Sequence, residues 1–411
     1  MRVGSASVCL CLSVMALGMP AMPGRIPGDR LVANLSERLK VEPGNAAIYY
    51  LIGRAHYATF SRAVESDGSK KGEVEILEFE NSLPEFYSLP GNIYPWDSKT
   101  AVKDTPANRR HIGEAIRNLR LALNMTEKPT KATKVYAQAD LAHLTLACSF
   151  DSGALLASKI KLEAPFEHLN TTDLWRAKAA DEYLLAFQAS ISQDLRTGEQ
   201  PIFGLQTLVA FEAGKSYLRL RPKSTQSASV KAGIEHLIKL PPCRAVTPLV
   251  LDLSGAKPLA ELLDNTLNVK FDLDGSGRSQ AYTWVKPTTG FLVWDPLKEG
   301  RITSGRQLFG NATWWMLWPN AFAALDALDD NHDGWLTGRE LKGLAIWFDR
   351  NSNGKCDPGE VVPIEQTPIT ALRTSYDSKS GTSLVSTLGL RLRDGRTLPT
   401  YDWVVSSTQA Q

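Results

Sequence analysis

Residues 329–360 read DDNHDGWLTGRELKGLAIWFDRNSNGKCDPGE and contain two twelve-residue stretches with the same spacing of oxygen-bearing side chains. The first, 329–340, and the second, 349–360, carry these side chains at positions 1, 3, 5, 9 and 12 and a glycine at position 6. Ca²⁺ in proteins binds about six to eight oxygen ligands from carboxylates, amides and backbone carbonyls. The expected ligands are Asp329, Asn331, Asp333, Trp335 (backbone), Thr337 and Glu340, then Asp349, Asn351, Asn353, Lys355 (backbone), Asp357 and Glu360.

This spacing resembles that of the EF-hand loop, in which glycine at position 6 permits a sharp turn and glutamate at position 12 supplies two oxygens. Residues 321–365 carry nine Asp or Glu residues against four Lys or Arg residues, so the region would attract a cation. The second stretch has asparagine at positions 3 and 5, and fewer charges predict weaker binding there. The sequence thus predicts two calcium sites.

Short helices are expected around these loops. Residues 320–328 are predicted to form an entering helix, with Phe322, Leu325 and Leu328 facing inward. Residues 339–348 are predicted to form one helix shared by both loops, begun by a capping box between Thr337 and Glu340. A last helix of about one turn is predicted from Asp357, ended by Pro363. Such short, shared helices favour a structural calcium site over a sensor.

Two further stretches have incomplete spacing. Asp272, Asp274, Ser276, Arg278 (backbone) and Gln280 fit a weaker possible site, but position 12 is Thr283 and lacks the chelating carboxylate. A structural turn is an equally good interpretation. In the stretch that begins at Asp295, Leu297 replaces a ligand at position 3, so no metal is expected.

The order of FDLDGSG, WVKPTTGFLVWD, ALDALDDNHDGWLTGREL and LAIWFDRNSNGKCDPGE resembles a bacterial calcium-binding module over residues 266–366. That module occurs in secreted iron-regulated proteins of the repeat-in-toxin type and in bacterial EF-hand domain proteins. In some relatives it supports calcium-dependent self-cleavage at an Asp-Pro bond. Here Asn268-Val269-Lys270 occupies the corresponding place, which argues against self-cleavage.

The first residues predict export. A single arginine precedes the apolar run 8–19, which is too short to span a bilayer, and small residues follow at a plausible cleavage site. Residues 1–18 are therefore interpreted as a signal peptide, and the mature protein is expected to be secreted or periplasmic. No later segment has the length of a membrane span, and a net charge of +2 without a basic stripe argues against nucleic acid.

Residues 30–221 are predicted to be helical, with a break between two helices at Pro43-Gly44-Asn45 and a polar insertion at 66–106. Ala115-Leu119-Ala122 and Ala179-Tyr183-Ala186 share one spacing of small and large residues, and Tyr49, Ile52 and Gly53 have the spacing of a partner helix. These features resemble the tetratricopeptide repeat, whose stacked helices form a concave surface for a peptide or protein. A plain helical bundle remains the alternative.

The fold class predicted is multi-domain, with an all-α helical-repeat domain followed by a small α+β domain. Residues 222–244 are predicted to be a linker, and 245–411 the calcium-binding domain. Within it, 245–253 is predicted to be a strand, 257–263 a short helix, and the end of the chain from 369 two or three antiparallel strands with a turn at Asp394-Gly395. Eight of the ten tryptophans follow residue 280, which predicts an aromatic core.

No catalytic pattern is present: the six histidines lack the HExxH spacing, and no G-x-S-x-G or phosphate-binding glycine loop occurs. We therefore expect an exported, non-enzymatic protein whose C-terminal domain is stabilised by Ca²⁺ and whose helical domain binds an unidentified protein or peptide. The alternatives are a calcium-dependent self-processing or hydrolytic module, and a calcium sensor that exposes a partner-binding surface.

Overall fold

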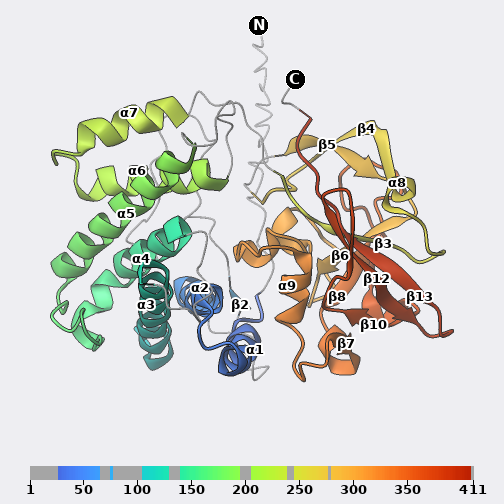
Figure 1. Ribbon diagram of the computed structural model, residues 1–411, viewed down its shortest axis with the longest axis horizontal. Coiled ribbons are helices and arrows are strands. Elements are labelled where there is room, and N and C mark those ends of the chain that lie inside the picture. The colour runs from blue at the N-terminus through green and yellow to red at the C-terminus, as the bar shows by residue number, and fades with distance from the viewer. Residues whose placement is uncertain are drawn as a thin grey trace, which may run out of the picture.

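The computed structural model describes residues 26–64, 75–76, 104–128, 139–194, 205–237, 245–275 and 279–408. Helices form one side of the molecule and strands the other (Figure 1). The predicted order, an α-helical part followed by an α+β part, is confirmed. The predicted signal peptide, most of the insertion at 66–106, and residues 276 and 278 of the weaker predicted site lie outside the described residues.

The helical part consists of consecutive helices whose ends agree with their local sequence. Pro43-Gly44-Asn45 separates the first two helices, as predicted. Thr105 caps the third helix by accepting a hydrogen bond from Asn108 N at 3.1 Å, and Pro106 occupies the first helical position, where a missing N–H costs nothing. The helices are α1 (Gly28–Val41), α2 (Ala46–Arg62), α3 (Pro106–Glu127), α4 (Ala139–Gly153), α5 (Thr172–Asp194), α6 (Leu205–Leu220) and α7 (Ser227–Leu237), with a 3-10 turn, η1 (Ala154–Lys159).

Small residues allow these helices to approach closely. A Cβ atom on Gly53 of α2 would lie 2.7 Å from Leu119 Cγ and 3.2 Å from the Ala115 carbonyl of α3, so only glycine fits. Ala179, Tyr183 and Ala186 of α5 are all buried. The residues that the sequence singled out for their spacing therefore lie at helix contacts. Two short strands, β1 (Ala63–Val64) and β2 (Glu75–Ile76), pair beyond the end of α2.

The C-terminal part is built on a strongly curved antiparallel sheet. Its strand order is β7-β10-β12-β13-β3-β6-β8-β9, with β11 added on β12. The turn at Asp394-Gly395 joins β12 to β13, as predicted, and Gly395 has a φ of 88°. The strands are β3 (Leu249–Asp252), β6 (Thr289–Trp294), β7 (Trp335–Thr337), β8 (Leu344–Trp347), β9 (Val361–Pro363), β10 (Ile369–Arg373), β11 (Ser378–Ser380), β12 (Ser383–Leu392) and β13 (Thr397–Asp402).

A separate hairpin, β4 (Leu263–Phe271) with β5 (Gln280–Val285), covers one face of this sheet, and the short helix α8 (Leu259–Leu262) precedes it. Its Trp284 ring packs against Phe291 of β6 and Trp347 of β8, at centroid distances of 5.1 and 6.1 Å. The aromatic core that the tryptophan distribution predicts is thus present between hairpin and sheet.

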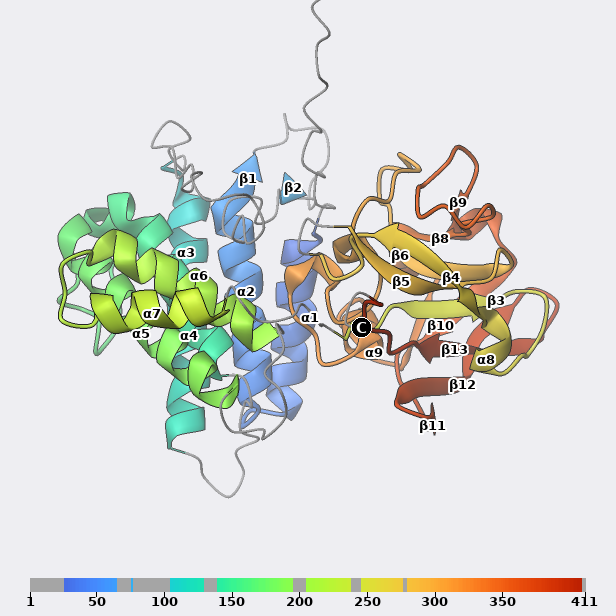
Figure 2. The same cartoon turned by 90° about the horizontal axis from the view of Figure 1, so that it is seen from above.

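The opposite face of the sheet joins the helical part through one continuous apolar core. Leu31 and Leu35 of α1 belong to the same buried cluster as Phe322 and Leu325 of α9 (Ala321–Asp326). Arg54 of α2 is 3% exposed and donates from Nε to the Trp315 carbonyl at 2.9 Å, so a buried polar contact also crosses between the two parts. Figure 2 shows α1 and α9 side by side.

Two predicted helices are wrong. The predicted helix 339–348 is a 3-10 turn, η4 (Gly338–Leu341), followed by strand β8, and the turn predicted from Asp357 leads into strand β9. Gly343 interrupts the first of these at a φ of 92°, against the Trp294 ring. All four residues of β8 are buried between β6 and β9, and a continuous apolar run suits a strand covered on both faces. The entering helix is confirmed as α9, with Asn320 as its cap.

The predicted linker 222–244 contains helix α7, so most of its described residues are ordered helix rather than irregular chain. Val230 and Leu237 of α7 are buried, and Ile234 packs against Gly214 of α6. The sequence of this segment is rich in polar residues because only one face of α7 is buried against α6.

Candidate functional site

The first loop, 329–340, is closed by hydrogen bonds from its own backbone. At position 1, Asp329 Oδ2 accepts from Gly334 N at 2.8 Å. At position 12, Glu340 Oε1 accepts from Asp330 N at 2.8 Å and its Oε2 accepts from Thr337 N at 2.8 Å. The side chains at positions 3 and 5 each accept from the backbone N–H two residues further on, at 3.0 and 2.9 Å. The acidic and amide side chains are thereby fixed along one tight turn.

The second loop, 349–360, has the same arrangement. Asp349 Oδ2 accepts from Gly354 N at 2.8 Å, while Glu360 accepts from the N–H groups at positions 2 and 9 at 2.8 and 3.0 Å. At positions 3 and 5, the side chains of Asn351 and Asn353 again accept from the backbone N–H two residues further on, at 3.2 and 2.6 Å. Position 4 has a positive φ in both loops, 59° and 55°, and so does the glycine at position 6, at 84° and 67°. The shared spacing therefore produces a shared conformation.

The carboxylates at the two ends of each loop are buried. Asp329 and Asp349 are 1% and 0% exposed, and Glu340 and Glu360 are 6% and 4% exposed. Burial raises the pKa of Asp329, and the charges of Glu340 and Asp333 raise it further. Burial likewise raises the pKa of Asp349, with Glu360 adding to the effect. A cation bound between the two buried end carboxylates of a loop would relieve the repulsion between their like charges.

One oxygen of the first loop lacks a partner. Asp329 Oδ1 is buried and accepts no hydrogen bond, although buried polar atoms are nearly always satisfied. A bound cation would satisfy it, so this residue set fits a hard divalent ion. Among the described residues no group of three or more His, Cys, Asp or Glu side chains is assembled for a metal. Asparagine and backbone oxygens would have to supply remaining ligands in both loops, and Thr337 would add one in the first loop.

The second loop also contacts tryptophans that the loop spacing does not predict. Trp284 Nε1 donates to Asp349 Oδ2 at 2.7 Å, and Trp347 Nε1 donates to Glu360 Oε2 at 3.4 Å. These indole N–H groups link the loop to the aromatic core. The amides of Asn351 and Asn353 both donate to Asp357 Oδ2 at 2.8 Å, and these bonds hold the pKa of Asp357 below its usual value.

Asp272, Asp274 and Gln280, the side-chain ligands of the weaker predicted site that the structure describes, are buried. Asp272 and Asp274 are 6% and 2% exposed, and burial followed by the charge of Asp274 raises the pKa of Asp272 to about 8. Ser304 Oγ donates to Asp272 Oδ2 at 2.7 Å, and Gln280 Nε2 donates to Asp274 Oδ2 at 2.9 Å. Internal hydrogen bonds therefore engage these carboxylates, which favours the interpretation of this stretch as a structural turn.

The stretch at Asp295 preserves part of the loop conformation. Asp295 Oδ2 accepts from Gly300 N at 2.9 Å, the same bond between positions 1 and 6 as in the two complete loops. Leu297 is 36% exposed at position 3, where the complete loops have a polar ligand. The turn at Asp295 therefore forms without the full set of ligand side chains.

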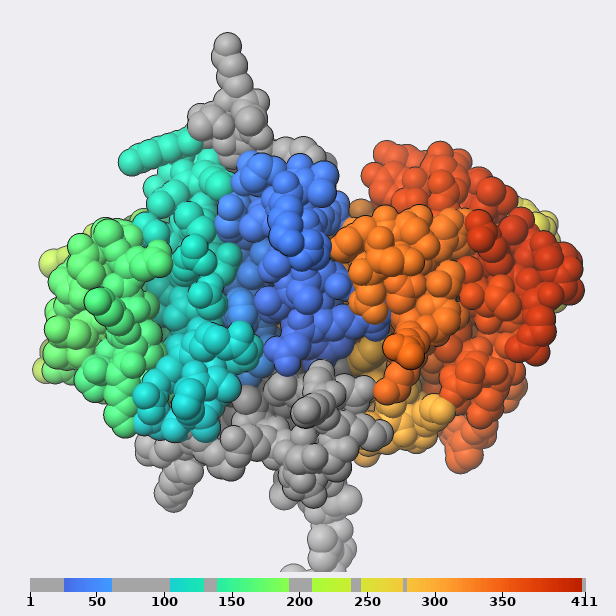
Figure 3. All heavy atoms as spheres, turned by 90° about the horizontal axis from the view of Figure 1, so that it is seen from below, coloured from blue at the N-terminus to red at the C-terminus, as the bar shows by residue number. Residues whose placement is uncertain are grey.

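Helix α1 packs on the first loop, a contact that sequence reasoning missed. Arg30 Nη2 donates to the Leu328 carbonyl, and Asn34 Nδ2 donates to the Ala327 carbonyl at 3.0 Å and to Asp330 Oδ1 at 2.9 Å. Arg38, one further helical turn along, forms an ion pair with Asp326. The spacing of 30, 34 and 38 marks a polar stripe on α1, but nothing in the sequence identifies its partner. Figure 3 shows the helices at the start of the chain against the loop region.

Residues 249–405, from β3 to just beyond β13, match the SPM domain family. The iron-regulated protein FrpA of Neisseria meningitidis serogroup C is 28% identical over 170 residues. This alignment covers 40% of the present chain and 14% of FrpA, so the chain spans a small fraction of that relative. None of the helices in the described ranges is long and apolar enough to cross a membrane.

Proposed function

We propose that this protein binds Ca²⁺ in the loops 329–340 and 349–360 and that the ions stabilise its C-terminal part. The observation that carries the proposal is the unpartnered, buried Asp329 Oδ1 within a loop that has calcium-ligand spacing. The loop holds two further carboxylates at predicted ligand positions, Asp333 and Glu340, and the second loop repeats its backbone turn. Similarity to the iron-regulated protein FrpA over 170 residues supports only the proposal that the protein is exported.

A stabilising role suits the elements that follow the loops. The first loop includes β7 and the second leads into β9, and both strands are paired in the large sheet. Sensor EF-hands respond to calcium by changing the angle between two flanking helices. Here only α9, a helix of six residues, flanks a loop. Calcium is therefore proposed to fix the sheet in place rather than to open a groove.

The helical part is proposed to be a tetratricopeptide-like scaffold for a protein or peptide. Gly53 against Leu119, and the buried Ala179, Tyr183 and Ala186, support this interpretation because small residues at fixed spacing hold such helices together. Export of the protein is proposed from the apolar run at 8–19.

Calcium titration of the full chain by calorimetry, followed by near-ultraviolet circular dichroism, tests the proposal. We expect heat from binding and a spectral change, because Trp284 and Trp347 contact the second loop. The double variant Asp329→Asn with Asp349→Asn should lose both signals. Asp173→Asn with Asp181→Asn, on the exposed side of α5, makes the same change in charge and should retain them. Absence of heat in the wild type, or equal heat in both double variants, would refute calcium binding at these loops.

A further inference from the structure

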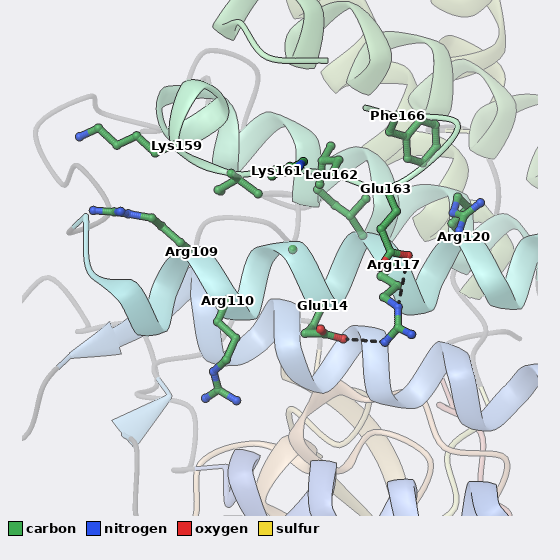
Figure 4. A pocket seen from close by; sticks show the side chains of 13 residues that line it. Arg109, Arg110, Glu114, Arg117, Arg120, Lys159, Lys161, Leu162, Glu163 and Phe166 are labelled. Atoms are coloured by element: carbon green, nitrogen blue, oxygen red, sulfur yellow. Dashed lines mark hydrogen bonds and ion pairs between the residues drawn. The ribbon is translucent and has the colours of Figure 1, made fainter. Parts of the chain in front are cut away.

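We propose that a cationic groove on the helical part binds an acidic peptide segment with apolar side chains between its acids. The groove has a volume of about 300 Å³ and lies between α3 and residues 159–166, which begin at the last residue of η1 (Figure 4). This inference rests on the scaffold role proposed for the helical part and is independent of calcium.

The charge of the groove is concentrated relative to the rest of the protein. Its lining contains six basic and two acidic residues, whereas the whole chain has a net charge of only +2. Figure 4 shows Arg109 and Lys159 at one end and Arg120 at the other. The basic residues are Arg109, Arg110, Arg117, Arg120, Lys159 and Lys161.

Internal ion pairs use only some of these cations. Asp104 pairs with Arg109 at 2.6 Å and with Lys159, and Arg117 lies 3.4 Å from Glu114 and 3.6 Å from Glu163. Arg120 and Lys161, in contrast, have no ion-pair partner among the residues that the structure describes. Two cations on opposite walls are therefore available to carboxylates from outside.

The floor of the groove is apolar, and at Gly113 it has no side chain. Ile116, Ile160 and Leu162 line it and are buried, with Phe166 half-buried at one end. Gly113 lies in the middle of α3, where glycine costs about 1 kcal/mol relative to alanine. A Cβ atom there would come no closer than 3.8 Å to Ile160, so packing within the chain does not require this glycine. Its missing side chain deepens the groove instead.

These dimensions and chemistry favour a peptide. From residue 109 to residue 120 the helix rises about 17 Å, the length of roughly five extended residues. Apolar side chains of a peptide could cover the floor while its carboxylates reach Arg120 and Lys161. A nucleic acid presents phosphates without interruption, and these would meet Glu114 and Glu163 in the same groove.

The probe is a fluorescein-labelled ten-residue peptide in which Glu and Asp alternate with Leu and Val, measured by fluorescence anisotropy on the full chain. We expect binding that weakens at least fivefold between 50 and 300 mM salt, both in EDTA and in calcium. The same peptide with Gln and Asn in place of its acids should bind at least tenfold more weakly. Failure of the acidic peptide to bind would overturn the proposal.

Two sets of variants locate the site. Arg120→Glu with Lys161→Glu should lower the affinity for the peptide at least tenfold. Lys223→Glu with Lys231→Glu makes the same change in charge at exposed positions of the helical part and should lower the affinity less than twofold. Gly113→Leu keeps every charge but fills the floor and should also lower affinity tenfold. Gly113→Ala should retain binding and fold at least as stably, which guards against an unfolded Leu variant.

The possible outcomes distinguish this proposal from two alternatives, a peptide site elsewhere on the helices and a general polyanion surface. Equal binding by the groove variants and the wild type would overturn the groove while leaving a scaffold role elsewhere on the helices. Tighter binding of a (dT)10 oligonucleotide or of vesicles containing phosphatidylserine, unaffected by Gly113→Leu, would show a general polyanion surface and overturn the peptide assignment. Calcium heats should be unchanged in every groove variant, because the groove and the loops lie in different parts of the molecule.

Discussion

Arg30 Nε lies 2.7 Å from Asp330 Oδ1, a contact that joins the first helix of the chain to position 2 of the first candidate calcium loop. Its guanidinium also contacts the backbone carbonyls of Leu328 and Glu340, so one side chain reaches both ends of the loop. The helical and sheet parts are therefore held together at the loop, 300 residues away in sequence from α1.

Arg30→Ala should destabilise the protein by about 2 kcal/mol, because charge-assisted hydrogen bonds are worth roughly that much and two carbonyls lose their donor. The measurement is urea-induced unfolding of the full chain in EDTA. Lys40→Ala, also on α1, is the control, since Lys40 pairs with Glu37 at the surface and its loss should cost less than about 0.5 kcal/mol. Equal effects of the two substitutions would show that the Arg30 contacts do not stabilise the structure.

The position-6 glycines offer a matched pair with different surroundings. Both Gly334 and Gly354 have positive φ, so alanine should cost about 1 kcal/mol at either one. At Gly354 a Cβ atom would also lie 2.5 Å from the Lys270 carbonyl of β4, whereas at Gly334 nothing lies within 4 Å. Gly354→Ala should therefore cost at least about 3 kcal/mol in the same unfolding assay. Similar losses at both glycines would contradict the tight packing of the second loop on the hairpin.

The sequence predicted local features well and long-range contacts poorly. The helix break at Pro43-Gly44-Asn45 and the turn at Asp394-Gly395 depend on residues with strong local preferences, and both are confirmed. Residues 344–347 were predicted as helix because Leu-Ala-Ile-Trp has no polar residue to reveal its period. Pairing with β6 and β9 decided in favour of a strand, and those partners lie outside any local window.

At the candidate site, too, local features could be predicted from the sequence and long-range contacts could not. The candidate ligands of each loop lie within twelve residues of each other, so their spacing alone was enough to single out the two loops. The contacts of Asp349 with Trp284 and of Asp330 with Arg30 depend on the tertiary fold, and no residue pattern specifies them in advance.

Asp329→Asn should have opposite effects with and without calcium. In EDTA the substitution removes a buried charge near Glu340 and Asp333 and should raise the Tm by about 2–4 °C, equivalent to roughly 1 kcal/mol. In millimolar calcium the wild type should gain stability through ligand binding while the variant gains much less, so their order reverses. Differential scanning calorimetry under both conditions provides the measurement. A variant less stable than the wild type in EDTA would show that Asp329 stabilises the loop without an ion.

A buried histidine pair should make the helical part sensitive to acid. His56 Nδ1 of α2 and His111 Nδ1 of α3 lie 2.9 Å apart, and Arg110 Nη2 contacts His111 Nε2 at 3.2 Å. Because Arg110 can only donate, His111 Nε2 accepts, and its Nδ1–H must donate to His56. Both rings are therefore neutral in the folded protein, and protonation of His56 would bring two N–H groups face to face.

Burial, then the neighbouring His111 and Arg110, lowers the pKa of His56 to about 3, and burial and Arg110 also lower the pKa of His111 against a smaller opposing effect of Asp29. The unfolded chain binds a proton at His56 near pH 6.5. The contribution of neutral His56 to the free energy of unfolding is therefore fully present above that pH and is lost as the pH is lowered toward 3. From pH 7.5 to 4 the loss from His56 alone should be about 3 kcal/mol. Urea unfolding across this range should show that loss in the wild type and in His236→Gln, an exposed control. His56→Leu with His111→Leu should reduce the pH dependence by at least that amount, because the lowered pKa of His111 adds its own contribution. An unchanged slope in the double variant would place the acid sensitivity elsewhere.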